Sequence, residues 1–87
     1  MRELSYTVTD KHDLAAKTAL DIIRLAGAYN CRTYVSKNNY ITDIDKLFIF
    51  LSYGIAKGDT IKFITDGLDE KPAIDKIDNY ITSNLKN

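Results

Sequence analysis

Residues 52–59 constrain the fold of this chain more than any other part of the sequence. Gly54 can adopt the left-handed conformation that commonly ends a helix. Gly58 and Asp59 have the chemistry of a tight turn, and a strand is predicted directly afterwards, over residues 60–65. The chain must therefore end a short helix, turn sharply and enter a strand within a few residues.

Alternation of apolar and polar residues predicts four strands. Leu4, Tyr6 and Val8 lie on one side of the first strand, and further strands are expected at 32–35, 40–44 and 60–65. Asn38 tolerates positive φ, so a hairpin turn is predicted between the second and third strands.

Apolar residues at helical spacing predict three helices. The first begins at an N-cap, Asp13, ends near Asn30, and buries a stripe made of Ala19, Ile22, Ile23 and Ala26. The second covers residues 46–53, and the third begins near Pro72 and buries Ile74, Ile77 and Ile81. The order β-α-β-β-α-β-α is typical of an α+β open-faced sandwich, with helices on one face of a sheet.

Composition limits the classes of function. The 87 residues suit a single domain over residues 1–87, and the 12 basic and 12 acidic residues balance, which argues against nucleic-acid binding. The one cysteine, Cys31, excludes an internal disulfide and is interpreted as a small hydrophobic residue, and no metal constellation or cofactor motif is present. No stretch is long enough to span a membrane, so we expect a cytoplasmic protein.

The segments 52–59 and 66–70 resemble the corresponding parts of HPr, the histidine-containing phosphocarrier family of the bacterial sugar phosphotransferase system. The resemblance continues along nearly the whole chain without obvious gaps. It implies the HPr-like arrangement of a four-stranded antiparallel sheet covered on one face by three helices. It also implies phosphoryl transfer as the family activity.

The residues that define the family's active site differ in this chain. Family members carry a Gly-Ile-His-Ala-Arg-Pro-Ala pattern at the start of the first helix, and residues 13–19 occupy that place here. The phosphorylated histidine corresponds to Ala15, the arginine to Lys17 and the proline to Thr18. A regulatory serine found in many members corresponds to Lys46. We therefore predict that the chain has no catalytic residue at the family position.

His12 is the only histidine and the one alternative acceptor. It precedes the family position by three residues, near a helix N-terminus that would stabilise an anion. Asp13 would repel a phosphoryl group, and an exposed loop histidine is the more common situation. An active phosphocarrier that uses His12 remains the alternative function.

A partner-binding surface is predicted on the first and second helices, which the family uses to bind its partners. Five consecutive apolar residues, 47–51, cannot all be buried by a two-turn helix. The predicted surface consists of Lys17, Leu20, Arg24, Lys46, Leu47, Phe48 and Leu51. The competing interpretation is that Phe48 and Ile49 pack against the domain.

Two further side chains have simpler interpretations. Tyr34 projects from the open face of the sheet, where an aromatic ring can stack on a base of single-stranded nucleic acid. A cross-strand packing role fits better, because the RNA-recognition consensus is absent. Ser52 has no base nearby in the sequence and is interpreted as a helix-end residue.

These observations favour a non-phosphorylatable interaction or regulatory module. The expected partner is a protein, either a phosphotransferase-system component or a regulator, and a second copy of the chain is an alternative partner.

Overall fold

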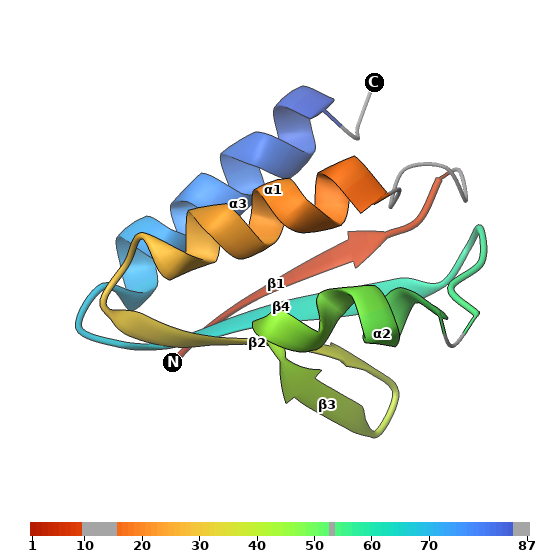
Figure 1. Cartoon of the computed structure of the whole chain (residues 1–87), viewed down its shortest axis with the longest axis horizontal. Coiled ribbons are helices and arrows are strands. Elements are labelled where there is room, and N and C mark those ends of the chain that lie inside the picture. Colours follow the sequence, from red (N-terminus) through yellow and green to blue (C-terminus); the bar gives the residue numbers. More distant parts are fainter. Residues whose placement is uncertain (10–15, 53, 85–87) are drawn as a thin grey trace.

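The computed structural model describes residues 1–9, 16–52 and 54–84. The element order is the predicted one, with one short 3-10 helix added before the second α-helix. The elements, labelled in Figure 1, are β1 (Arg2–Thr7), α1 (Ala16–Gly27), β2 (Cys31–Lys37), β3 (Tyr40–Asp43), η1 (Ile44–Lys46), α2 (Leu47–Ser52), β4 (Thr60–Gly67) and α3 (Glu70–Asn84). Within these residues, no helix is both long and apolar enough to cross a membrane.

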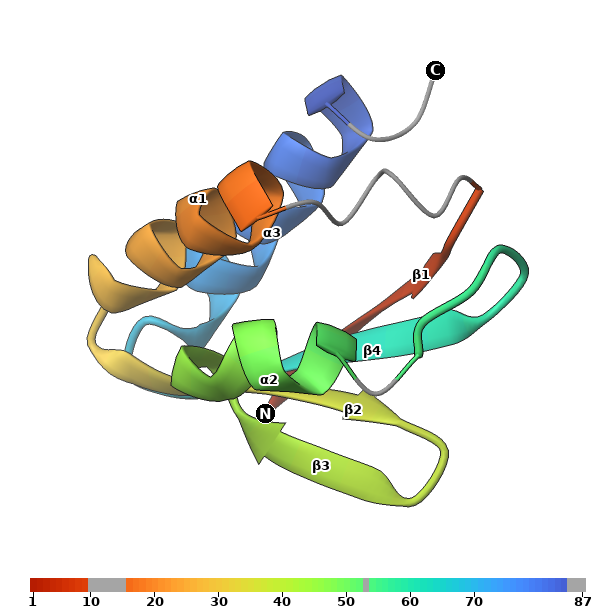
Figure 2. The same cartoon turned by 45° about the vertical axis from the view of Figure 1, so that its right-hand side comes forward.

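The four strands form one antiparallel sheet in the order β1-β4-β2-β3. The central strand β4 pairs with β1 on one side and with β2 on the other, so that Phe63 lies between Leu4 and Val35. The two views agree that α1, α2 and α3 cover the same face of the sheet (Figures 1 and 2). The predicted fold class is confirmed.

The core lies between this face and the helices. Most residues of the predicted stripes are buried: Tyr6 and Val8 in and after β1, Ala19, Ile22 and Ala26 in α1, and Ile74, Ile77 and Ile81 in α3. Ile61 and Phe63 of β4 are buried with them, whereas Leu4 is only partly buried. Ile23 is only partly buried and packs at the margin of this core. The regular spacing of these residues thus orients α1 and α3 on the sheet.

The segment after α2 has the predicted turn chemistry. Gly54 and Gly58 both have φ of 93°, a conformation that side chains other than glycine rarely adopt. The N–H of Gly58 donates to the carbonyl of Val8, and the N–H of Val8 donates to the carbonyl of Asp59, both at 2.8 Å. These bonds fasten the segment to the end of β1 and lead directly into β4.

The third strand is shorter than predicted. Asn38 has the expected positive φ, 56°, in the hairpin, but the strand ends at Asp43 rather than at Ile44. The carboxylate of Asp43 accepts a hydrogen bond from the N–H of Asp45 at 2.9 Å and caps η1. This cap turns the chain at Ile44, whose side chain is buried from η1 instead of from the strand. The fourth strand is longer than predicted and continues to Gly67, which pairs with Cys31 of β2.

Candidate functional site

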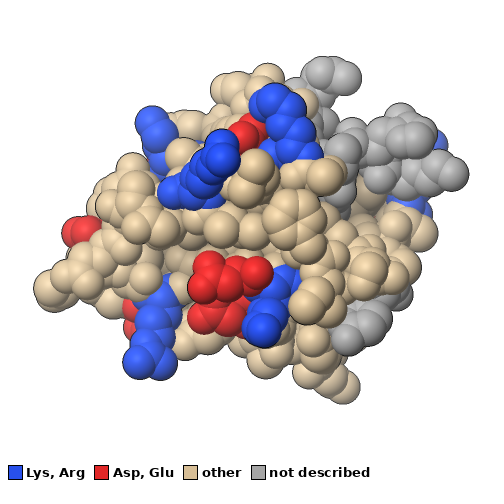
Figure 3. Space-filling view, viewed as in Figure 1, with Lys and Arg blue, Asp and Glu red and all other residues tan. Residues whose placement is uncertain are grey.

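The predicted partner-binding residues lie on α1, η1 and α2, which pack against one another on the helical side of the sheet. In the space-filling view, Lys and Arg side chains with an acidic group among them lie over α1 and α3, and an uncharged band separates them from the acidic and basic groups below (Figure 3). We define the α1–α2 surface as the residues of this region that are not fully buried: Lys17, Leu20, Arg24, Lys46, Phe48 and Leu51.

Leu47 does not belong to this surface, and its predicted place there is wrong. Its exposed fraction is 0%, and Phe50, three residues further on, is also buried. Residues three apart in a helix share one side, so Leu47 and Phe50 together form the core-facing side of α2. The prediction failed because a run of five apolar residues contains no polar position to mark the outer side.

Phe48 is exposed, as predicted. Its exposed fraction is 45% and that of Ile49 is 50%, which contradicts the interpretation that both pack against the domain. Leu51 is partly buried and touches the margin of the core. An exposed phenylalanine beside a partly covered leucine forms an apolar patch of the kind found at interaction sites.

The ring of Phe50 shows which side of α2 faces α1. It stacks on Tyr40 of β3 with a centroid distance of 5.9 Å and an angle of 16° between the planes. Going around the helix, Phe48 lies almost opposite Phe50, whereas Ile49 and Leu51 lie at similar angles on the two sides of Phe50, with Leu51 on the same flank as Phe48. Because Phe50 faces β3 and α2 also packs against α1, the flank with Phe48 and Leu51 is the one nearer to α1, where Leu20 has an exposed fraction of 37%.

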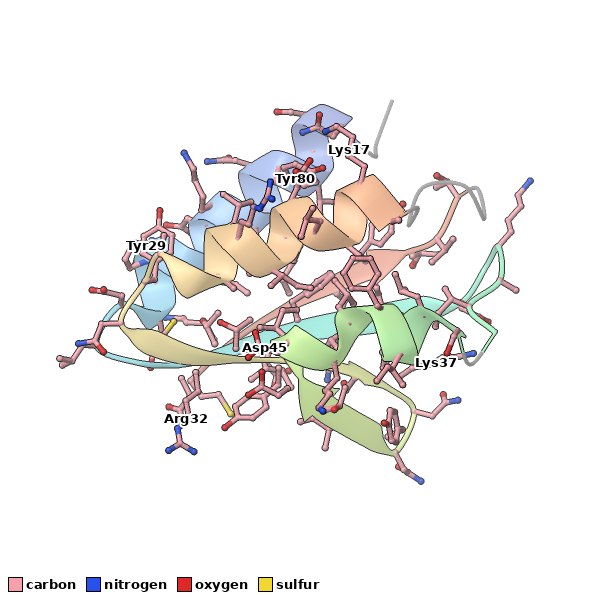
Figure 4. All side chains as sticks on the ribbon, viewed as in Figure 1. Lys17, Tyr29, Arg32, Lys37, Asp45 and Tyr80 are labelled. Carbon is pink, nitrogen blue, oxygen red and sulfur yellow. The ribbon has the colours of Figure 1, made fainter. Side chains whose placement is uncertain are left out.

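The charge of Lys17 is already paired within α1. Its Nζ donates to Oδ2 of Asp21 at 2.9 Å, and the hydroxyl of Tyr80 in α3 donates to the same oxygen at 2.7 Å (Figure 4). The hydrogen bonds from Lys17 and Tyr80 lower the pKa of Asp21, and the bond to Asp21 raises the pKa of Lys17. Burial, followed by the bond to Asp21, raises the pKa of the Tyr80 hydroxyl.

This cluster was only partly predictable. The spacing of Lys17 and Asp21 places them one turn apart on the outer side of α1. Tyr80 is 59 positions from Asp21, and no local pattern in the sequence relates them. Arg24 lies next to the cluster and borders a groove of about 330 Å³ between α1 and α3, lined also by Asp21, Leu25, Ala28 and Tyr80.

The other predicted residues have these positions. Ala15 and His12 lie outside the described residues. The hydroxyl of Ser52 donates to the carbonyl of Ile49 at 2.6 Å, which fits a helix-end role. Tyr34 is partly buried and pairs across the sheet with Ile64, and Cys31 is also partly buried. Within residues 1–9, 16–52 and 54–84, no group of three or more His, Cys, Asp and Glu side chains is placed to hold a metal ion.

Solved structures share this fold along the whole chain. The HPr-C-His protein of Thermoanaerobacter tengcongensis superimposes with a TM-score of 0.82 at 24% identity, covering 100% of this chain and 98% of that one. The histidine-containing phosphocarrier protein of Mycoplasma superimposes with a TM-score of 0.81 at 24% identity over 97% of each chain. The HPr dimer of T. tengcongensis has a TM-score of 0.70 at 25% identity over 98% of each chain.

The family comparison agrees with the structural one. Residues 3–83 match the model of the PTS-HPr family, described as the PTS HPr component phosphorylation site. Members of this family act with the other components of the phosphotransferase system. This chain, with its four-stranded sheet and three covering helices, belongs to the HPr family.

Proposed function

We propose that this chain binds partner proteins of the phosphotransferase system through the α1–α2 surface and does not carry a phosphoryl group. The observation that carries the proposal is the alanine at position 15, where the family pattern has its phosphorylated histidine. The chain acts as a single domain over residues 1–87 in the cytoplasm.

The chemistry of position 15 supports the absence of transfer. A phosphoryl group on histidine is held by a bond from an imidazole nitrogen to phosphorus, and the methyl group of Ala15 offers no nucleophile. Lys17 replaces the family arginine with a single ammonium group, which lacks the planar fork of donors that matches phosphoryl oxygens. Its Nζ is in addition 2.9 Å from the Asp21 carboxylate, which competes for the same charge.

The exposed side chains of the α1–α2 surface support the proposal that this chain binds partner proteins. Phe48 is half exposed on the side of α2 that faces α1, and Leu20 is partly exposed on α1. Complete burial of a fully exposed phenylalanine contributes about 1.5–3 kcal/mol, so a partner that covers the exposed 45% of Phe48 gains about half of that, one part of a weak to moderate affinity. The charges around this patch are mixed: Lys17 is paired with Asp21, and Lys46 follows Asp45 in η1, so Arg24 and Lys46 would mainly influence the orientation of a bound partner.

The partner that fits best is a phosphotransferase component that also binds active HPr proteins, because the chain belongs to this family and has its fold. A regulator of the system is a further candidate. A second copy of the chain is an alternative partner, since a relative at 25% identity was solved as a dimer.

Incubation with phosphoenolpyruvate and the general enzyme of the phosphotransferase system tests the absence of transfer. We expect intact-mass spectrometry to show an unmodified chain, while an active HPr in the same mixture gains a phosphoryl group. A phosphorylated chain whose modification disappears in His12→Ala would overturn the proposal and establish His12 as the acceptor.

A further inference from the structure

Strand β3 is an edge of the sheet and exposes an apolar residue, Ile41, near its middle. Within the described residues it pairs only with β2, and both views show its outer side uncovered (Figures 1 and 2). Edge strands are commonly protected by shortness, charge, proline or a bulge; β3 is only four residues long and ends in Asp43, but its sequence Tyr-Ile-Thr-Asp has no lysine or proline and its register is uninterrupted. Ile41 has an exposed fraction of 55%, the largest in this strand among the large hydrophobic residues.

The register of the hairpin shows which backbone groups point outward. Lys37 and Tyr40 close a two-residue loop, and such a closing pair exchanges both backbone hydrogen bonds. Pairs then alternate, so Val35 and Thr42 are bonded to each other, whereas Ser36 and Ile41 form a pair without direct bonds. The N–H and the carbonyl of Ile41 therefore both point away from β2.

Asp43 is the other residue of β3 whose backbone groups point outward, but it already serves as the N-cap of η1. Its carboxylate accepts from the N–H of Asp45 and caps η1, and the carbonyl of an N-cap residue ordinarily accepts the first hydrogen bond of its helix. Ile41 is thus the one residue of β3 that offers both a backbone donor and a backbone acceptor to an added strand.

We propose that β3 pairs antiparallel with β3 of a second copy of this chain, across a two-fold axis at Ile41. The N–H of each Ile41 donates to the Ile41 carbonyl of the second copy, which gives two identical hydrogen bonds and one continuous eight-stranded sheet. This surface is distinct from the α1–α2 surface and goes beyond the proposed function.

The residues that become neighbours in this register are compatible. The two exposed Ile41 side chains lie side by side on the open face of the sheet and cover each other. Asp43 lies opposite Asn39 of the second copy, so that the carboxylate meets an amide instead of a like charge. Tyr40 lies opposite Thr42 of the second copy. No pair in this register places two equal charges together.

The dimer leaves the proposed docking surface open. Phe50 points from α2 toward β3, and Phe48 lies almost opposite Phe50 around the helix. A second copy added at the edge of β3 therefore does not cover Phe48. The assembly would present two α1–α2 surfaces, so that a dimeric or multivalent partner would bind more tightly than a monomeric one.

Ile41→Pro tests the proposal directly. Proline at residue 41 removes the outward N–H and leaves the hydrogen bonds between β2 and β3 in place. An edge strand tolerates proline in this arrangement, in which the missing N–H would face solvent. Two hydrogen bonds are lost per dimer, so we expect the association constant to fall about tenfold or more. Sedimentation equilibrium of the full chain over a wide concentration range measures it. Ile41→Val, which keeps the N–H and a β-branched side chain, is the matched control and should dimerise like the wild type.

Thr42→Pro provides the opposite control. It removes an N–H that is bonded to β2, so it should lower the melting temperature more than Ile41→Pro does. A wild-type chain that is monomeric up to millimolar concentration would overturn the proposal. So would an Ile41→Pro chain that is folded and dimerises as tightly as the wild type.

Cross-linking tests the position of the two-fold axis. In a Cys31→Ala background, which removes the other thiol, Ile41→Cys places two thiols on residues about 5.5 Å apart between Cα atoms, within disulfide range. Ser5→Cys on β1, the opposite edge of the sheet, is the control. We expect rapid disulfide formation for Ile41→Cys only. A dimer that is lost in Phe48→Asp and retained in Ile41→Pro would assign self-association to the α1–α2 surface and contradict the edge pairing.

Discussion

Helices α1 and α2 cover the same face of the sheet, but their outer sides differ. The outer side of α1 is charged, and the carboxylate of its Asp21 accepts hydrogen bonds from both Lys17 and Tyr80. The outer side of α2 is apolar, and Phe48 and Ile49 are each about half exposed, at 45% and 50%.

This difference separates two contributions to binding. Apolar surface supplies affinity when it is removed from water, whereas exposed charges mainly influence orientation and association rate. On the α1–α2 surface, Phe48 is therefore expected to supply most of the affinity. Lys17, already paired with Asp21, is expected to contribute less than an unpaired lysine would.

The largest effect is expected from the buried side of α2. Leu47→Ala should lower the free energy of unfolding by about 2–5 kcal/mol, because it leaves a cavity in the core. That is a large part of the total stability of a small domain. Phe48→Ala should cost much less, since its side chain is half exposed. Urea denaturation of both variants measures the difference, and equal losses would contradict the two-sided description of α2.

The next effect concerns the exposed side of the same helix. Phe48→Asp should weaken binding of the partner about tenfold or more while the melting temperature stays close to that of the wild type. Ile49→Asp is the matched control, because Ile49 has similar exposure but lies nearer to β3. A large fall in melting temperature for Phe48→Asp would exclude Phe48 as an interface residue. Equal loss of binding for both variants would show that the surface is centred elsewhere on α2.

A smaller effect is expected at the start of α1. Ala15→His alone should restore little phosphoryl transfer, because an acceptor imidazole needs donors placed at the phosphoryl oxygens. Adding Lys17→Arg and Thr18→Pro should raise the rate about tenfold over the single variant, since it restores the forked donor and the family's proline in the first turn of the helix. Equal transfer rates for the single and triple variants would show that residues 17 and 18 do not limit transfer.

The smallest effect is the pH dependence of the α1 cluster. The folded-state pKa of Asp21 is lowered, so its stabilising contribution is present above the unfolded value of about 3.9 and is lost as pH falls through the lower folded value. In Lys17→Met, NMR titration should show the Asp21 pKa moving up toward its ordinary range. Tyr80→Phe should move it in the same direction by less, because the Lys17 bond is the stronger cause. An unchanged Asp21 pKa in Lys17→Met would mean that the pair does not form in solution.

The long helices and the sheet were predictable, because their burial follows simple periods. Ile74, Ile77 and Ile81 recur at helical spacing, and the glycines at 54 and 58 mark turns that require positive φ. The outer side of α2 was not predictable in full, since all of residues 47–51 are apolar. Its orientation depends on a contact between Phe50 and Tyr40, which lie on different elements.

Two other features depend on tertiary contacts or local competition. The end of β3 is set by the Asp43 cap, which competes successfully with the strand tendency of Ile44. The Tyr80 bond to Asp21 joins residues 59 positions apart and becomes visible only when α1 and α3 are packed together. The sequence therefore indicated the candidate residues on α1, such as Lys17, but not the hydrogen bond from Tyr80 to Asp21 that joins α1 to α3.

The central claim is that the chain occupies the partners of active HPr proteins without accepting a phosphoryl group. The most direct measurement is the initial rate at which the general enzyme phosphorylates an active HPr from phosphoenolpyruvate, with increasing amounts of this chain added and the masses of both proteins followed. The account predicts a falling rate, no phosphoryl group on this chain, and weaker inhibition by Phe48→Asp. A phosphoryl group on this chain, or a rate that is unaffected by a large excess of it, would contradict the account.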